Sequence, residues 1–201
     1  MHKKITIIDY KLGNVSAISN MLSRIGEKPE ITDNHDKIDN SDFIILPGVG
    51  SFDRAIKNLE DKDLLSILNK KISDNTKILG ICLGMQILCN GSEEGTKRGF
   101  GVFDVECKSF ETKNSSKIFI GWSDIKIIEQ INDFRFMNNN KFYFLHKYYF
   151  PINKDYTIGI SDNDLNFSSF VKKNNIFGVQ FHPEKSHNYG INFFKNFLNL
   201  K

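Results

Sequence analysis

The stretch GICLG at residues 80–84 places Cys82 between two glycines, where a strand-like run gives way to a helix-like one. This Gly-x-nucleophile-x-Gly form is typical of a nucleophile elbow, a strained turn that lifts the central side chain out of a sheet. Side chains two positions away would collide at such a turn, and the glycines remove them. A helix beginning after the turn, near Met85, would stabilise a thiolate. The alternative is a buried strand cysteine, which is the interpretation we favour for Cys89 and Cys107.

A thiol nucleophile needs a base, and the base needs an orienting partner. The segment GVQFHPEKS supplies both, because His182 and Glu184 lie two positions apart and would project to the same side of an extended chain. Pro183 favours an extended conformation at His182 and ends the strand. We therefore predict a triad of Cys82, His182 and Glu184, with the carboxylate fixing the imidazole tautomer and favouring its charged form. The alternative is a surface His-Pro-Glu turn.

Acyl transfer also needs donors for a developing oxyanion. The segment PGVGSF at residues 47–52 is a glycine-containing turn after an apolar run. We predict a hole made by the backbone N–H groups of Val49 and Leu83. A phosphate-binding loop is the competing interpretation, but the glycine spacing matches neither the Walker nor the dinucleotide fingerprint.

The elements that position these residues alternate between strand and helix periods in the first half. We predict strands at residues 4–9, 29–32, 42–47 and 76–81, and helices at 15–25, at 52–72 with a break near 61–63, and from 84 to 89. Near-continuous apolar strands indicate a parallel sheet covered on both faces. Such sheets bind ligands at the carboxyl ends of their strands, where PGVG and CLG both lie.

The second half changes to short β-branched and aromatic runs, at residues 101–110, 117–122, 141–150, 156–161, 167–173 and 175–181. These runs predict antiparallel or mixed strands joined by polar turns, followed by a helix at 189–200. Neither repeats nor a linker interrupt the chain. We therefore expect residues 1–201 to form one α/β domain.

Charge, apolar runs and cysteine spacing argue against nucleic acid, membranes and metals as partners of this chain. The 27 lysines and arginines are scattered among 24 acidic residues, giving a net charge of +3, which argues against nucleic acid. No signal-peptide pattern and no run long enough for a membrane span is present. Three cysteines at spacings of seven and eighteen fit neither a disulfide framework nor a metal site. We expect a cytoplasmic protein without metal, cofactor or membrane contact.

Four motifs, PGVGSF, GICLGMQ, SEEG and GVQFHPEKS, together resemble the triad-type class I glutamine amidotransferases in order and separation. DYKLGN, the Gly-Trp pair at 121–122 and HPEKS narrow the resemblance to the glutaminase subunits of imidazole glycerol phosphate synthase. It covers essentially the whole chain. It implies a flavodoxin-like fold, with a mostly parallel central sheet flanked by helices and additional antiparallel strands.

The resemblance implies that Cys82 attacks the side-chain amide carbon of glutamine, that His182 protonates the departing ammonia, and that water hydrolyses the resulting thioester to glutamate. It assigns Gln86 and Glu94 to the amino-acid end of the substrate, where the carboxylate suits the substrate ammonium. The residues that it places around the oxyanion are Gly48, Val49 and Leu83.

Family members deliver ammonia through a channel to a (β/α)8-barrel cyclase subunit, in histidine biosynthesis. The resemblance therefore implies a heterodimer, with docking and signalling positions at Asn14, Trp122 and Lys185. For Trp122 a core aromatic is an equally good interpretation.

Three departures from the family pattern fall where members meet substrate or partner. Lys11 replaces a usual glycine, Lys147 stands in a His-Lys-Tyr sequence where the family has His-Ser-Tyr or His-Thr-Tyr, and IFIGWS replaces the usual segment around Trp122. The triad is intact, so glutamine hydrolysis remains the expectation. The acceptor is left open between the histidine pathway and a paralogous role, in which the ammonia amidates a surface-polysaccharide sugar.

Two other classes of function compete. A stand-alone cysteine hydrolase or deglycase often carries histidine directly after the elbow cysteine, but Leu83 is there. A non-catalytic structural subunit would be expected to have lost Cys82, His182 or Glu184, and all three are retained.

Overall fold

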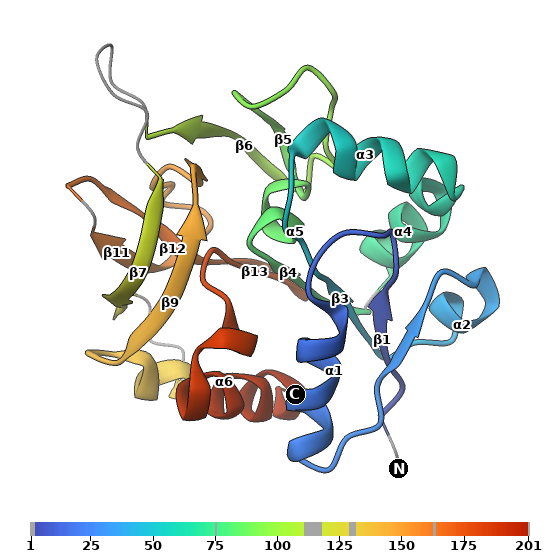
Figure 1. Cartoon of the computed structure of the whole chain (residues 1–201), viewed down its shortest axis with the longest axis horizontal. Helices are drawn as coiled ribbons and strands as arrows, with labels where there is room; N and C mark the ends of the chain where they lie inside the picture. Colours follow the sequence, from blue (N-terminus) through green and yellow to red (C-terminus); the bar gives the residue numbers. More distant parts are fainter. Residues whose placement is uncertain (1–2, 75, 111–117, 129–131, 163, 201) are drawn as a thin grey trace.

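A large central sheet organises the chain, in a computed structural model that describes residues 3–74, 76–110, 118–128, 132–162 and 164–200 (Figure 1). Its parallel part holds, in spatial order, β2 (Glu30–Thr32), β1 (Ile5–Ile8), β3 (Phe43–Leu46), β4 (Lys77–Ile81) and β13 (Ile176–Val179). The antiparallel part continues with β12 (Asn166–Lys173), β11 (Thr157–Asp162) and β8 (Lys126–Ile127). The predicted α/β class, mostly parallel with antiparallel strands from the second half, is confirmed.

Helices cover both faces of this sheet (Figure 1). One face carries α1 (Val15–Arg24) and α6 (His187–Asn199). The other carries α2 (His35–Asp39), α3 (Phe52–Asp61), α4 (Leu64–Ser73) and α5 (Leu83–Gln86). On β3, Phe43 and Ile45 enter the first core while Ile44 and Leu46 enter the second. Because both faces are buried, the strand needs no polar alternation, which explains its continuous apolar run.

The long helical segment at 52–72 is broken where the sequence predicted. α3 ends at Asp61 and α4 begins at Leu64. Between them Asp63 adopts left-handed backbone angles, with φ at 55°. Such a conformation cannot continue a right-handed helix, so the chain changes direction there.

The helix predicted from residue 84 to 89 is wrong beyond its first turn, because α5 ends at Gln86. The N–H groups of Phe100 and Val102 bond to the carbonyls of Ile87 and Leu88, which draws this segment into an extended pairing. The strands that result are β5 (Cys89–Ser92) and β6 (Phe103–Ser109), which pair in parallel. Cys89 and Cys107 are buried there with their sulfur atoms 3.6 Å apart, as the packing interpretation predicted.

Smaller sheets from the second half flank the core. β7 (Phe119–Asp124) pairs with β9 (Lys141–His146), and β10 (Tyr148–Tyr149) pairs with β6. The run at 141–150, predicted as one strand, is therefore two strands that separate at Lys147. The 3-10 helices are η1 (Asn132–Met137) and η2 (Pro183–Lys185). Position 117 of the strand predicted at 117–122 lies outside the described residues. No helix in the described part of the chain is both long and apolar enough to cross a membrane.

Candidate active site

Cys82 lies on a strained turn between β4 and α5. Its backbone angles are φ 52° and ψ −108°, which non-glycine residues rarely adopt. A Cβ added to Gly84 would lie 1.9 Å from the carbonyl oxygen of Leu46, and one added to Gly80 would lie 2.5 Å from that of Gly84. The predicted steric need for both glycines is therefore confirmed, and the cysteine occupies a nucleophile elbow.

His182 and Glu184 meet just beyond the end of β13. The imidazole Nδ1 lies 2.9 Å from Oε1 of Glu184, and both side chains are almost fully buried. The predicted pairing is present, but the predicted reason for it is wrong. The chain is extended only at His182, and the 3-10 turn η2 then brings the carboxylate back toward the ring.

Backbone contacts hold the histidine in place. The N–H of His182 donates to the carbonyl of Tyr143 on β9 at 2.8 Å. Its own carbonyl accepts the hydroxyl of Ser186 at 2.7 Å, and that hydroxyl also accepts the N–H of Tyr143 at 3.0 Å. His182 is therefore held at its ring by Glu184 and at its backbone by Tyr143 and Ser186.

The electrostatics favour a charged imidazole beside the sulfur. Burial lowers the pKa of His182 because it disfavours the imidazolium. The charge and hydrogen-bond interactions with Cys82 and Glu184 outweigh this effect and raise the pKa to about 10. Nε2 of His182 is buried without a hydrogen-bond partner among the described residues. Since Nδ1 is held by Glu184, Nε2 is the nitrogen that can exchange a proton with the sulfur or a substrate.

A second glutamine beside the sulfur was missed from the sequence. Nε2 of Gln180 lies 3.5 Å from Sγ of Cys82, and its Oε1 accepts the side-chain amide of Gln86 at 3.3 Å. The signal was its position two residues before His182 near the end of an apolar strand, since alternate residues of a strand share a side. The sulfur also lies 3.7 Å from the carbonyl oxygen of Leu145.

A small pocket of about 90 Å³ opens above Cys82. Of the residues predicted for substrate and oxyanion, the pocket is lined by Val49, Leu83, Gln86 and Glu94. Segment 145–148, between β9 and β10, forms another wall. Gly48 does not line the pocket but supports it, because a Cβ there would lie 2.6 Å from the backbone nitrogen of Gly84.

Glu94 reaches the pocket from the loop after β5. Its Oε2 accepts the N–H of Phe52 at 2.8 Å, at the start of α3, where Ser51 provides no side-chain cap. Burial raises the pKa of this carboxyl, and the nearby Asp53 adds to the rise, whereas the Phe52 hydrogen bond and Lys147 oppose it. The helix start thus fixes the carboxylate at the pocket wall.

Of the three residues predicted for partner contact, Trp122 and Lys185 share a neighbour, Tyr143, whereas Asn14 lies at the start of α1. Trp122 on β7 is 42% exposed, so it is not a core aromatic. Its ring meets that of Tyr143 edge-on at 5.9 Å, and Nζ of Lys185 lies 5.5 Å from the same Tyr143 ring. Asn14 is exposed at the start of α1, where its side chain caps the helix by accepting the N–H of Ala17 at 3.3 Å.

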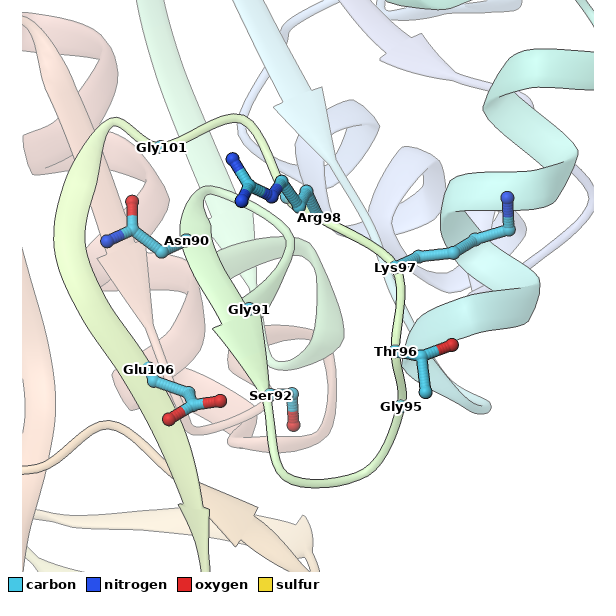
Figure 2. Close-up of a pocket in the computed structure, with 10 residues that line it drawn as sticks. Asn90, Gly91, Ser92, Gly95, Thr96, Lys97, Arg98, Gly101 and Glu106 are labelled. Carbon is cyan, nitrogen blue, oxygen red and sulfur yellow. The ribbon is translucent and has the colours of Figure 1, made fainter.

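A larger cavity, of about 580 Å³, lies under the loop that joins β5 to β6 (Figure 2). Three of its polar side chains are paired with neighbours: Lys97 points toward α3 and pairs with Glu60 at 2.7 Å, Asn90 bonds to Asp104 at 2.6 Å, and Glu106 pairs with Lys108 at 2.9 Å. Its lining contains neither cysteine nor histidine. Within the described residues no cluster of His, Cys, Asp or Glu could hold a metal ion. The small pocket at Cys82 is therefore the site with chemistry.

Comparisons with known proteins agree with this geometry. The model of the family "Glutamine amidotransferase class-I" matches residues 6–200. "Imidazole glycerol phosphate synthase subunit HisH 2" of Methanococcus maripaludis is 43% identical, over 96% of this chain and 98% of that protein. The protein of the same description from Pseudomonas aeruginosa is 36% identical over 98% and 99%, and "Imidazole glycerol phosphate synthase subunit HisH" of Bdellovibrio bacteriovorus is 36% identical over 98% and 100%.

Solved structures show the same fold at much lower identity. The "Structure of PurLQS from Thermotoga maritima" superposes with a TM-score of 0.75 at 19% identity, covering 99% of both chains. A "Crystal structure of glutamine amidotransferase" gives a TM-score of 0.75 at 14% identity, covering 96% of this chain and 97% of that one. With a family model spanning nearly all of its length and relatives above 30% identity, the chain belongs to the class I glutamine amidotransferase family.

Proposed function

We propose that this chain is the glutaminase subunit of an imidazole glycerol phosphate synthase, which hydrolyses glutamine and passes the ammonia to a cyclase subunit. The observation that carries the proposal is the convergence of an elbow cysteine with a buried, carboxylate-bound histidine: Cys82, His182 and Glu184. Whole-length similarity to three subunits of that synthase supports the choice of reaction.

The first step is attack by Cys82 on the side-chain amide carbon of glutamine. The raised pKa of His182 favours an imidazolium beside the sulfur, and a positive charge beside a cysteine promotes nucleophilic attack by its sulfur. The carbonyl oxygen becomes an oxyanion, for which the N–H groups of Leu83 and Val49 are the donors. Both residues line the pocket at the sulfur, and Gly48 allows the two turns to approach closely.

Collapse of the intermediate needs a proton for the leaving ammonia. Nε2 of His182 supplies it, leaving a γ-glutamyl thioester on Cys82. The neutral imidazole then takes a proton from water, which attacks the thioester and releases glutamate. Glu184 holds Nδ1 throughout, and so keeps Nε2 facing the reaction.

The amino-acid end of the substrate lies at the pocket mouth, where Gln86 and Glu94 hold it. Glu94 is a fixed carboxylate of the kind that binds an ammonium group. Gln86 is itself held, because its side-chain amide donates to the carbonyl of Tyr148 at 3.0 Å and to Gln180. A rigid pocket places the amide carbon at the sulfur.

The partner in this proposal is a (β/α)8-barrel cyclase subunit in the cytoplasm. It docks on the edge formed by Asn14, Trp122 and Lys185. This edge is close to the triad, because the Tyr143 that contacts both Trp122 and Lys185 also accepts the N–H of His182. Ammonia released at Nε2 would therefore have a short route to the partner.

The decisive experiment measures ammonia release from glutamine in the presence of the cognate barrel subunit. Cys82→Ala removes the nucleophile and is expected to lower turnover by about 1,000-fold or more. Cys107→Ala removes a buried thiol that lies outside the pocket, and this variant should release ammonia at the wild-type rate. Turnover that persists in Cys82→Ala would contradict the triad.

A second candidate is a paralogous glutaminase that supplies ammonia for amidation of a surface-polysaccharide sugar. It is favoured by the altered segment before Trp122, where Ile118 and Ile120 are 58% and 60% exposed and so present an unusual docking surface. The test is product formation. A complex that makes imidazole glycerol phosphate from glutamine and the phosphoribulosyl precursor supports the first candidate, whereas glutamine hydrolysis without that product supports the second.

A further inference from the structure

The pocket above Cys82 is bounded by two side chains of opposite charge. Glu94 comes from the loop after β5, and Lys147 comes from the junction between β9 and β10. Lys147 is half-buried, and its Nζ lies 5.8 Å from the centre of the Tyr148 ring, another pocket residue. His146 also lines the pocket but stays neutral, because burial lowers its pKa to about 3.

The two charges act on each other across the pocket. Lys147 opposes the rise that burial causes in the pKa of Glu94, so its ammonium is close enough to favour the carboxylate form. Both side chains are also held by their surroundings, Glu94 by the N–H of Phe52 and Lys147 by the ring of Tyr148. The pocket wall therefore presents a fixed negative group and a fixed positive group.

An α-amino acid carries the matching pair of charges. When the side-chain amide carbon of glutamine lies at Sγ of Cys82, its α-carbon lies two methylene groups away, toward the outer wall of the pocket. The α-ammonium and the α-carboxylate then diverge from one carbon. In this partly buried setting each charge needs a partner of opposite sign, because an unpaired charge loses hydration without compensation.

We propose that Lys147 binds the α-carboxylate of the substrate and so determines specificity for a free α-amino acid, with Glu94 taking the α-ammonium. The inference rests on the proposed glutaminase function and deepens it. The segment that resembles the family's His-Ser-Tyr or His-Thr-Tyr offers a cation here in place of a neutral hydroxyl. An ammonium donor adds charge–charge attraction to its hydrogen bond with a carboxylate, which a hydroxyl donor does not.

The experiment compares two substrates that differ only at the α-carboxylate: L-glutamine and its methyl ester, with ammonia release measured in the complex with the cognate barrel subunit. Lys147→Met is expected to lower kcat/KM for L-glutamine by roughly 10- to 100-fold, mainly through KM. For the methyl ester the change should stay below about threefold, since the lost partner has no charge to bind. Lys147→Arg keeps the cation and should retain the preference for L-glutamine.

Two matched controls complete the design. Lys57→Met removes a lysine that is exposed on α3, outside the pocket, and should leave both substrates unaffected. Lys147→Ser restores a family-like hydroxyl and should fall between wild type and Lys147→Met. Equal losses for the two substrates in Lys147→Met would overturn the proposal, as would no loss at all. Failure of the proposed function is distinguishable, because wild type would then release ammonia from neither substrate.

Discussion

Two buried histidines near the elbow are driven to opposite protonation states. The pKa of His182 rises to about 10, because Cys82 and Glu184 together outweigh its burial. The pKa of His146 falls to about 3, because burial and the nearby charge of His182 outweigh the hydrogen bond of its Nδ1 with the carbonyl of Tyr148, at 2.9 Å. Partner groups rather than depth of burial therefore decide which of the two histidines carries the positive charge.

Replacing Glu184 with glutamine tests whether this carboxylate raises the pKa of His182. The variant loses the carboxylate that favours the imidazolium, so the basic limb of the kcat/KM profile should move to lower pH, with kcat reduced roughly 100-fold or more.

The raised pKa also links His182 to the stability of the fold. The contribution of its charged form to the free energy of unfolding is complete below about pH 6.5 and is lost as pH rises toward 10. Urea unfolding at pH 6 should therefore show a larger loss in Glu184→Gln than unfolding near pH 10.

The exposed Glu60→Gln provides the control for charge, since that side chain pairs with Lys97 at the surface, away from the pocket. An unchanged pH profile in Glu184→Gln would show that the carboxylate does not set the charge of His182.

Sequence reasoning found the pair of His182 and Glu184 from motif and spacing. It missed Gln180, because strand alternation places that side chain on the side of His182 but does not reveal that the fold sets it 3.5 Å from the sulfur.

At the scale of elements, the elbow exists because two backbones approach without side chains between them. α5 lies against β4 and the carboxyl end of β3, which is why the Leu46 carbonyl would meet a Cβ at Gly84. The same closeness brings the PGVG turn to the elbow. Parallel strands 43–46 and 77–81 thus deliver the nucleophile and the oxyanion turn to one edge of the sheet.

Gly84→Ala should therefore destabilise the fold strongly. Its Cβ would lie 1.9 Å from a backbone oxygen that cannot move without shifting β3, so we expect a loss of about 3 kcal/mol in the free energy of unfolding. Gly91→Ala is the matched control, since its nearest neighbour would be 3.9 Å away, and it should cost less than about 1 kcal/mol. Urea denaturation measures both, and a near-wild-type Gly84→Ala would contradict the elbow geometry.

Elements were predictable where local pattern and long-range pairing agreed. The apolar strands of the parallel sheet and the break near Asp63 followed from residue types alone. The helix expected at 84–89 failed because Ile87 and Leu88 bond to a segment thirteen residues on, which no local period reveals. The run at 141–150 failed similarly, since β9 and β10 separate to pair with β7 and β6.

For the whole molecule, the proposed catalytic residues and the exposed apolar surface lie on connected elements. β7 is antiparallel to β9, and Trp122 stands opposite Tyr143, whose carbonyl holds His182. Ile120 and Trp122 alternate with partly buried residues along β7, so their side chains project from the same side of the strand. A partner that covers this surface would therefore contact β7, which is paired with the strand that holds the backbone of His182.

Trp122→Ala tests that arrangement. An exposed tryptophan at a docking surface is a typical binding hot spot, so removing it should weaken the complex with the cognate barrel subunit by roughly 30-fold, and reduce partner-stimulated glutamine hydrolysis accordingly. The isolated chain should remain folded but unfold at a somewhat lower urea concentration, because the ring meets that of Tyr143 at 5.9 Å and stacks on that of His187 at 5.4 Å. Ile31→Ala replaces an exposed apolar residue on β2, an edge strand of the central sheet to which β7 does not belong, and should leave the dissociation constant unchanged. Calorimetric titration distinguishes these cases, and equal affinity of Trp122→Ala and wild type would place the partner on another surface.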